Sequence, residues 1–313
     1  MKAVFLDRAT FAADVSLPAP AGVSDWRVFE RSEPAEVIAR SCEADIIITN
    51  KIVFDAELLA QLPQLKLIQI TATGTDNVDK IAAEKQGIKV FNVSGYSTDS
   101  VAEHTLMMIL ATMRALSAHH RSVASGAWIK DGRFSLSTPA LWDLKGKTLG
   151  LVGIGSIAHR VTELAQAFGM NVLWAERLGR APRDDRYTDF ETVMAASDVI
   201  ALHCPLTAET KHLINHQTIA MMKRAPILIN VARGAVMEAE AVAQALQKGQ
   251  LSGLGCDVFL PEPPEADNPL LQFANHPRVI LTPHNAWASF ESQQQLWAIL
   301  STQVSNFIVS SAK

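Results

Sequence analysis

The sequence predicts an α/β fold of two domains, each built on a parallel sheet, with a doubly wound arrangement in the larger one. Three observations support this prediction. Short apolar runs rich in β-branched residues alternate with segments of helical periodicity along most of the chain. A glycine-rich turn near the middle of the chain joins one such run to a helical segment. The length of 313 residues is sufficient for roughly two domains.

The first part of the chain alternates between expected strands and expected helices. Buried parallel strands are expected where four or five consecutive residues are apolar or β-branched. One of the helices ends before Gly87, and glycine is the residue best suited to a helix C-terminus. The expected strands are residues 3–6, 45–49, 67–71 and 89–93, and the expected helices are residues 34–41 and 78–86.

A longer helix, residues 100–118, is expected to connect the two domains. Its apolar residues repeat at helical spacing, and Ser100 followed by Glu103 has the pattern of a capping box. A second series of apolar runs then provides six strands, the number that two βαβαβ halves require. These expected strands are residues 148–152, 171–175, 199–202, 227–231, 253–258 and 279–282.

The uncharged C-terminal segment, residues 292–312, has the length of a membrane span but not its composition. It carries four glutamines, an asparagine and several serines, a polar load that a bilayer segment would not tolerate. We therefore expect a helix over residues 291–309 that packs back on the first part of the chain. No signal peptide is expected, because Asp7 and Arg8 interrupt the apolar start of the sequence.

The composition excludes several classes of protein. With 28 basic and 32 acidic residues the net charge is −4, so no nucleic-acid-binding surface is expected. A hydrophobic content of 48% indicates a globular chain rather than a disordered one. The three cysteines form no CxxC pair, which favours a reducing, cytoplasmic location. No metal site is expected, since His119 and His120 have no carboxylate or thiol at ligand spacing.

The glycine-rich turn follows the expected strand 148–152 and predicts a dinucleotide-binding site. Its first glycine allows a tight turn, its second lets the backbone approach a pyrophosphate, and the following helix offers unpaired N–H groups. The next strand is followed by Glu176, where an acid can accept ribose hydroxyls, so NAD(H) is favoured over NADP(H). The adjacent Arg177 can offset the repulsion of a 2′-phosphate. The turn consists of Gly153, Ile154, Gly155, Ser156, Ile157 and Ala158.

Three polar residues follow the last three expected strands of this series. They are Arg233, Glu262 and His284. The carboxyl ends of strands in an open α/β sheet form the edge where ligands bind. An arginine can hold a carboxylate, a histidine can donate a proton to a carbonyl oxygen, and a glutamate paired with that histidine favours its protonated form. Each residue alone has an ordinary structural explanation, but the three together predict a catalytic set.

These segments resemble the D-isomer-specific 2-hydroxyacid dehydrogenases, and the resemblance covers nearly the whole chain. Within that family the sequence is most similar to the glycerate dehydrogenases, or hydroxypyruvate reductases. The family resemblance lies in residues 72–79, 100–104, 153–158 and 203–206 and in the segments around Arg233, Glu262 and His284. The closer resemblance lies in residues 95–101, 173–177 and 284–289. Ala158 and His159 depart from the family pattern, at positions that affect only local helix packing.

The resemblance implies a Rossmann-type NAD-binding domain, residues 99–285, inserted into a smaller flavodoxin-like substrate domain, residues 1–98 and 286–313. It implies that Arg233 binds and polarises a 2-oxoacid, that His284 is the acid/base and that Glu262 is its partner. Thr73 and Gly74 match the loop that receives the substrate carboxylate. The implied cofactor contacts are Thr73, Gly153, Gly155, Ser156, Ile157, Glu176, Arg177, Cys204, Val231, Ala232 and Asp257, with His284 beside them.

The sequence therefore predicts an NAD(H)-dependent oxidoreductase that reduces a short 2-oxoacid such as hydroxypyruvate or glyoxylate. Two alternatives stay open: a 3-phosphoglycerate dehydrogenase-like enzyme, and a dinucleotide-sensing regulator or corepressor on the same fold. A formate dehydrogenase is disfavoured, because Glu262 is present where that relative lacks the partner of the histidine. The resemblance also implies a homodimer, with residues 100–118 and the following loop through Trp142 as the expected interface.

Overall fold

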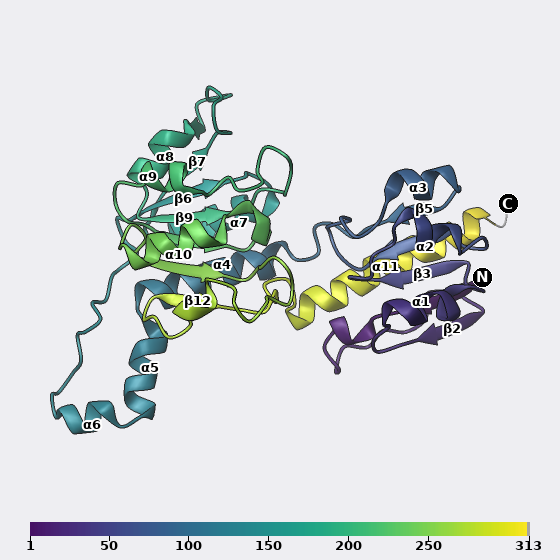
Figure 1. Ribbon diagram of the computed structural model, residues 1–313, viewed down its shortest axis with the longest axis horizontal. Helices are drawn as coiled ribbons and strands as arrows, with labels where there is room; N and C mark the ends of the chain where they lie inside the picture. Colours follow the sequence, from purple (N-terminus) through teal and green to yellow (C-terminus); the bar gives the residue numbers. More distant parts are fainter. Residues whose placement is uncertain (312–313) are drawn as a thin grey trace. The chain divides into compact units, whose positions relative to one another are not determined.

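The computed structural model describes residues 1–311, and the chain divides into two compact units. The small unit comprises Met1–Ser97 and the C-terminal segment that begins at Ala288. The large unit is the continuous stretch Thr98–Trp287. Each unit has its own parallel sheet (Figure 1). The chain therefore crosses between the units twice.

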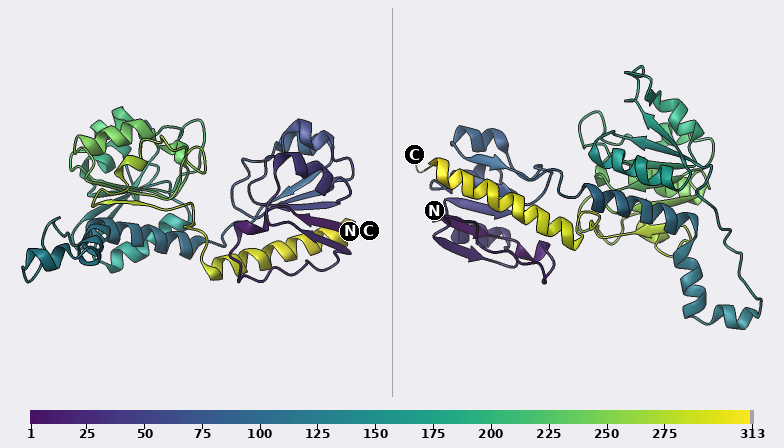
Figure 2. Two further views of the ribbon diagram at one scale, coloured as in Figure 1. Left: turned by 60° about the horizontal axis from the view of Figure 1, so that its bottom comes forward. Right: turned by 180° about the vertical axis from the view of Figure 1, so that it is seen from behind.

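The small unit is a five-stranded parallel sheet with the strand order β2-β1-β3-β4-β5. Helices α1 to α3 cover one face of the sheet and α11 covers the other (Figure 2). The strands are β1 Lys2–Phe5, β2 Asp25–Val28, β3 Ile46–Thr49, β4 Leu67–Ile70 and β5 Lys89–Phe91. The helices are α1 Pro34–Ser41, α2 Ala56–Ala60, α3 Lys80–Lys85 and α11 Phe290–Ser311, with a short 3-10 turn at Arg8–Thr10.

The alternation of side chains along β1 divides the core of the small unit between its two faces. Val4 and Leu6 belong to the apolar cluster that includes Val37 of α1 and Leu59 of α2. Phe5 points to the opposite face, where its ring stacks on that of Trp297 of α11 at 5.6 Å. The Gln69 side chain of β4 also bonds Gln303 of α11, at 3.0 Å. The expectation that the C-terminal helix packs on the first part of the chain is confirmed.

The sequence analysis missed one strand of this sheet, β2. It pairs in parallel with β1 at the edge of the sheet. Its residues Asp25 and Val28 are exposed and the two between them are only half-buried. An edge strand of this kind has no continuous apolar run, so the signal used to find buried strands is absent from it.

The large unit is a seven-stranded parallel sheet with the strand order β12-β11-β10-β9-β6-β7-β8. The strands are β6 Thr148–Val152, β7 Asn171–Ala175, β8 Tyr187–Thr188, β9 Val199–Leu202, β10 Ile227–Asn230, β11 Gly253–Cys256 and β12 Val279–Leu281. The helices are α4 Thr98–Met113, α5 Leu116–Ala124, α6 Ala127–Asp131, α7 Ser156–Ala167, α8 Phe190–Ala196, α9 His216–Ala220 and α10 Ala239–Gln247, with 3-10 turns at Gly234–Val236 and Leu271–Phe273.

Helices cover both faces of this sheet, as the doubly wound prediction requires. One apolar cluster contains Met108 of α4 and Val161 of α7, and the other contains Val193 of α8 and Val242 of α10. The strand order reverses between β6 and β9, which are neighbours in the sheet. All six expected strands are present to within two residues. The seventh, β8, is only two residues long and leaves no pattern in the sequence.

The expected helix over residues 100–118 was wrong in both its start and its continuity. The helix begins at Thr98, so Ser100 lies inside it rather than at its cap, and the Ser100 hydroxyl donates to the carbonyl of Ala286 at 2.7 Å. The helix ends at Met113, because Ala115 takes a left-handed conformation with φ of 45° before α5 begins. Arg278 donates to the terminal carbonyls of Thr112 and Met113. A residue near the C-terminal end of the large unit's sequence therefore stabilises the C-terminus of α4.

Among the described residues, no helix is both long and apolar enough to cross a membrane.

Candidate active site

The glycine-rich turn lies at the point where the strand order of the large sheet reverses. Gly153 follows β6 with φ of 90°, and a Cβ on it would lie 2.4 Å from the N and Cα atoms of Cys204, just after β9. No other residue fits this approach. A Cβ on Gly155, in contrast, would meet nothing within 4 Å, so the backbone there faces open space. Sheets of this type bind their ligands at such a reversal point.

Helix α7 begins directly after Gly155, with Ser156 and Ile157 in its first turn. No side chain caps this helix, so its first N–H groups and the positive end of its dipole are available to an anion. Open space at Gly155 and an uncapped helix start are what a pyrophosphate group requires. The residues of the turn therefore fit the dinucleotide that the sequence predicts.

The acid at the end of β7 does not present free oxygens. Glu176 is 3% exposed and its carboxylate accepts hydrogen bonds from the N–H of Arg177 and from the N–H and guanidinium of Arg183. The hydrogen bonds from Arg183 are the main cause that lowers the pKa of Glu176 to about 2. Sequence reasoning singled out Arg177 and missed Arg183, because the latter is brought back to Glu176 only by the loop between β7 and β8.

Three further expected cofactor contacts follow β9 and β10. Cys204 is buried, and burial raises the pKa of its thiol to about 11, so it is a small packing residue rather than a nucleophile. Val231 and Ala232 follow β10, and the N–H of Ala232 donates to the side chain of Asn230 at 3.0 Å. The expected strand 227–231 ends one residue early, so both residues belong to the loop that carries Arg233.

Gly234 brings the Arg233 loop against the loop that carries Glu262. A Cβ on Gly234 would lie 2.2 Å from the carbonyl carbon and oxygen of Phe259 and 2.8 Å from the N atom of Leu260. The backbones of the two loops are therefore in close contact at Gly234. The carbonyl of Arg233 accepts a hydrogen bond from the Asn230 side chain at 3.0 Å, which holds this loop from the other side.

Glu262 and His284 form a direct pair. Nδ1 of His284 lies 2.6 Å from Oε2 of Glu262, and the side chains are 24% and 29% exposed. The other carboxylate oxygen of Glu262 accepts from the N–H of Phe259 at 3.0 Å, which orients the carboxylate. Because Nδ1 faces Glu262, the Nε2 atom of His284 is directed to the opposite side of the ring.

The His284 backbone is held in an uncommon conformation by Asp257. His284 has φ of 53°, a left-handed value rarely adopted by residues other than glycine and asparagine. Its N–H donates to the carbonyl of Asp257 at 2.8 Å. The Asp257 carboxylate, 1% exposed, accepts from the N–H groups of Asn285 and Ala286, each at 3.0 Å. Asp257, expected as a cofactor contact, thus also anchors the histidine loop.

A histidine that sequence reasoning did not assign completes this network. The hydroxyl of Thr282 donates to Asp257 at 2.5 Å, so Nε2 of His104, 3.2 Å from the same hydroxyl, must be the donor to it. Burial lowers the pKa of His104, with the nearby Asp257 charge opposing the shift. The only signal in the sequence was the position of His104 within the family-like segment 100–104.

Thr73 and Gly74 belong to the small unit, whereas Arg233, Glu262 and His284 all belong to the large unit. Both residues lie in the loop after β4, at the carboxyl edge of the small sheet. The Thr73 hydroxyl donates to the carbonyl of Val93 at 3.1 Å, and the Thr73 carbonyl accepts from the Asn92 side chain at 2.7 Å. These bonds tie the loop to the segment that follows β5.

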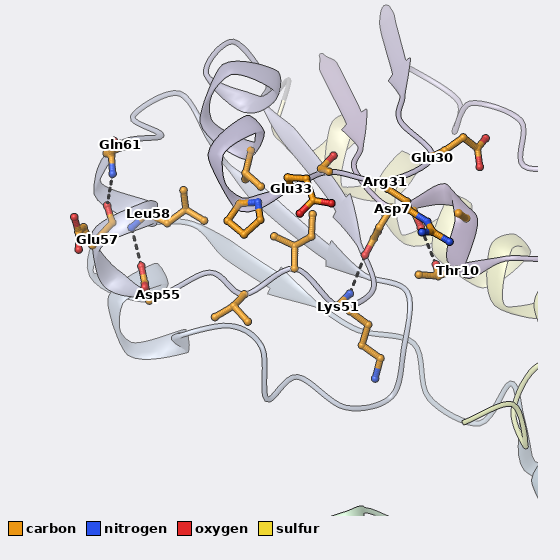
Figure 3. A pocket seen from close by; sticks show the side chains of 16 residues that line it. Asp7, Thr10, Glu30, Arg31, Glu33, Lys51, Asp55, Glu57, Leu58 and Gln61 are labelled. Carbon is orange, nitrogen blue, oxygen red and sulfur yellow. Dashed lines mark hydrogen bonds between the residues drawn. The ribbon is translucent and has the colours of Figure 1, made fainter. Parts of the chain in front are cut away.

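A pocket of about 770 Å³ lies on the carboxyl edge of the small sheet (Figure 3). It is lined by residues after β1 and β3, among them Asp7, Thr10, Lys51 and Asp55, and by none of the expected site residues. The carboxylate of Asp7 accepts from the N–H of Lys51 at 2.9 Å, and burial raises its pKa. Sequence reasoning used Asp7 only to exclude a signal peptide, although a polar residue at a strand end is a signal of a binding edge.

Comparison with known proteins identifies the family. Residues 106–286 match the family model described as "D-isomer specific 2-hydroxyacid dehydrogenase, NAD binding domain". A putative 2-hydroxyacid dehydrogenase of Haemophilus influenzae is 41% identical, with 98% of each chain covered. A glycerate dehydrogenase of Methylorubrum extorquens is 40% identical, with 98% of this chain and 96% of that protein covered.

A solved structure agrees in fold. The D-lactate dehydrogenase of Aquifex aeolicus, complexed with NAD and lactic acid, superimposes with a TM-score of 0.81 at 30% identity, covering 99% of this chain and 96% of that one. Together with the dinucleotide turn and the paired histidine and glutamate, these matches leave one conclusion. The chain belongs to the D-isomer-specific 2-hydroxyacid dehydrogenase family, whose members are NAD(H)-binding oxidoreductases.

Proposed function

We propose that this protein reduces hydroxypyruvate or glyoxylate to the corresponding D-2-hydroxyacid with NADH. The observation that carries the proposal is the 2.6 Å pair of His284 and Glu262, together with the close contact at Gly234 between the loop of Glu262 and the loop of Arg233. The M. extorquens relative is named glycerate dehydrogenase, which supports hydroxypyruvate as the substrate. The family membership supports a short 2-oxoacid in general.

The proposed roles follow from the chemistry of each side chain. Arg233 binds the substrate carboxylate and polarises its carbonyl oxygen through its forked guanidinium group. His284 donates the proton to that oxygen from Nε2, and Glu262 keeps the imidazole oriented through Nδ1. Bound NADH supplies the hydride that the carbonyl carbon accepts. Carbonyl reduction therefore needs one proton from the protein and one hydride from the cofactor, and His284 regains its proton from solvent.

We propose that the large unit holds the dinucleotide and that the small unit supplies Thr73 and Gly74 to the substrate carboxylate. This corresponds to the expected domains, residues 99–285 and residues 1–98 with 286–313. The open space at Gly155 and the uncapped start of α7 support pyrophosphate binding there. The backbone of the Thr73 loop, tied to the segment after β5, supports a preformed carboxylate site.

The activity is tested by the loss of NADH absorbance with hydroxypyruvate, glyoxylate, pyruvate and 3-phosphohydroxypyruvate. Replacing His284 with alanine is expected to lower kcat roughly 10²- to 10⁴-fold, because the positioned proton donor is lost. His216→Ala, on the exposed start of α9, is the matched control and is expected to keep the parent rate. A near-full rate for His284→Ala would overturn the role of His284.

We also propose a homodimer built on the arm formed by α5, α6 and the loop that follows. The support is a set of exposed apolar side chains: Ile129 is 84% exposed and Phe134 is 97% exposed, and Leu116, Val123 and Trp128 are exposed as well. Apolar surface of this kind is typical of an interface. The expected interface, residues 100–118 with the following loop through Trp142, contains this arm, whereas α4 itself is largely buried within the large unit.

The dimer is tested by light scattering at assay concentration. The double substitution Ile129→Asp and Phe134→Asp is expected to give a monomer, whereas Ile81→Asp, an exposed apolar position on α3, is expected to leave the dimer intact. A monomeric parent protein would refute the proposal. We propose a cytoplasmic location as well, supported by free thiols at Cys42, Cys204 and Cys256.

A further inference from the structure

Two polar side chains of α4 contact the loop that carries His284. The Ser100 hydroxyl donates to the carbonyl of Ala286 at 2.7 Å. Nε2 of His104 donates to the hydroxyl of Thr282 at 3.2 Å. Residues four apart in a helix lie on the same face, so one face of α4 contacts the loop on both sides of its histidine. The contacts fall two residues before His284 and two residues after it.

Helix α4 is firmly held against the rest of the large unit. Val101, Ala102 and Thr105, which adjoin the two polar residues in the sequence, are buried. Ala102 belongs to the apolar cluster that also contains Val161 of α7. The Thr105 hydroxyl donates to the carbonyl of Val101 at 2.7 Å, a bond that stays within the helix. Because the helix is packed in this way, side chains that project from it can fix the position of a neighbouring loop.

The loop of His284 requires such support. Its φ of 53° is unfavourable for a residue with a Cβ, and such a conformation persists only where the surroundings hold it. The hydroxyl of Thr282 has one proton, which it donates to the carboxylate of Asp257 at 2.5 Å, so its oxygen can only accept from His104. Removing the imidazole of His104 therefore takes the donor away from this chain of hydrogen bonds.

We propose that Ser100 and His104 are positioning residues, which hold the loop of His284 so that its Nε2 atom faces the carbonyl oxygen of the substrate. This rests on the proposed function, in which His284 donates a proton from Nε2. Both residues act through the loop, and the position of the loop matters because a misplacement of about 1 Å costs roughly 10²-fold in rate. Ala286 lies just before the chain leaves the large unit, so the Ser100 contact fixes the end of the loop within that unit.

The kinetic test removes each donor and then restores one of them. His104→Leu is expected to lower kcat for hydroxypyruvate about tenfold, and Ser100→Ala roughly three- to tenfold, the range for one neutral hydrogen bond. The KM for hydroxypyruvate is expected to change less than about threefold, because Arg233 binds the substrate carboxylate in the proposed function. His104→Gln replaces the ring N–H with an amide N–H and is expected to recover most of the lost rate.

The solvent deuterium isotope effect on kcat separates positioning from a merely structural role. It is expected to rise in His104→Leu, because a misplaced His284 donates its proton more slowly. Thr105→Val is the matched control, since it removes a buried hydrogen bond of the same helix that does not reach the loop. This control is expected to keep the kcat and the isotope effect of the parent, whatever stability it loses.

Amide hydrogen exchange provides a readout that needs no turnover. The N–H groups of His284, Asn285 and Ala286 are expected to exchange about tenfold faster in His104→Leu than in the parent or in His104→Gln. The proposal is overturned if both donor-removing variants keep kcat within about twofold of the parent, or if these N–H groups exchange at the parent rate. If the parent reduces none of the 2-oxoacids, the proposed function fails, and hydrogen exchange still decides whether α4 holds the loop.

Discussion

Replacing Gly234 with alanine is expected to push the Arg233 loop away from the loop of Glu262. The added Cβ would lie 2.2 Å from the carbonyl group of Phe259, whereas non-bonded carbon atoms pack at about 3.5–4.0 Å. These neighbours are backbone atoms, which cannot rotate out of the way. The two loops must therefore separate by more than about 1 Å, and a misplacement of that size costs roughly 10²-fold in rate.

The expected loss for Gly234→Ala is roughly 100-fold in kcat/KM, equivalent to about 2.7 kcal/mol of transition-state stabilisation. Steady-state kinetics with hydroxypyruvate measures this loss. Overpacking is expected to lower the free energy of unfolding by about 1–3 kcal/mol, measured in urea.

The matched control is Gly253→Ala, at the amino end of β11. Its Cβ would lie 2.6 Å from the carbonyl oxygen of Arg278, so it introduces a similar overlap at the edge of the sheet opposite the site. This variant is expected to lose stability but keep its kcat. If Gly234→Ala retains the parent kcat/KM within about twofold, the contact between the loops does not position Arg233 and the reasoning fails.

Three other predictions concern stability and the histidine loop. The ring nitrogens of His203 are buried with no partner among the described residues, and burial lowers its pKa to about 4, so below pH 6.5 the unfolded chain takes up a proton that the native protein does not. The free energy of unfolding in urea is therefore expected to be about 2 kcal/mol lower at pH 5 than at pH 7, and His203→Leu is expected to abolish this difference. Arg278→Ala is expected to lower the free energy of unfolding by about 3 kcal/mol in the same assay, because the guanidinium binds the end carbonyls of α4 and stacks on Trp142 at 3.5 Å. Thr282→Val removes the hydroxyl between His104 and Asp257, and it is expected to lower kcat about tenfold with little change in the NADH dissociation constant; an unchanged kcat would show that this hydroxyl does not position His284.

The buried strands could be predicted to within one or two residues, because a parallel strand covered on both faces is a continuous apolar run. Strand β6 and the helix over Pro34–Ser41 were predicted with their exact bounds. Strand β2 and the break between α4 and α5 at Ala115 could not be predicted from the sequence. The first is a half-exposed edge strand, and the second depends on Arg278, which lies far along the sequence.

The same distinction applies to the site. Arg233 and His284 could be predicted to share an edge, because parallel strands end on the same side of a sheet. The engagement of Glu176 by Arg183 could not, because it depends on how a loop of several residues returns to the strand end. The backbone contact at Gly234 could not be predicted either, because it depends on where the loop that contains Phe259 runs in the folded protein.

The placement of α11 has a consequence for the order in which the chain can fold. The large unit is one continuous stretch, so it can close its core without help from the rest of the chain. The small unit cannot, because the face that carries Phe5, Phe11 and Trp26 is covered by Trp297, which follows the whole large unit in the sequence. During synthesis this aromatic face stays exposed while nearly 200 residues are added, and that interval is when the nascent chain is most prone to aggregation.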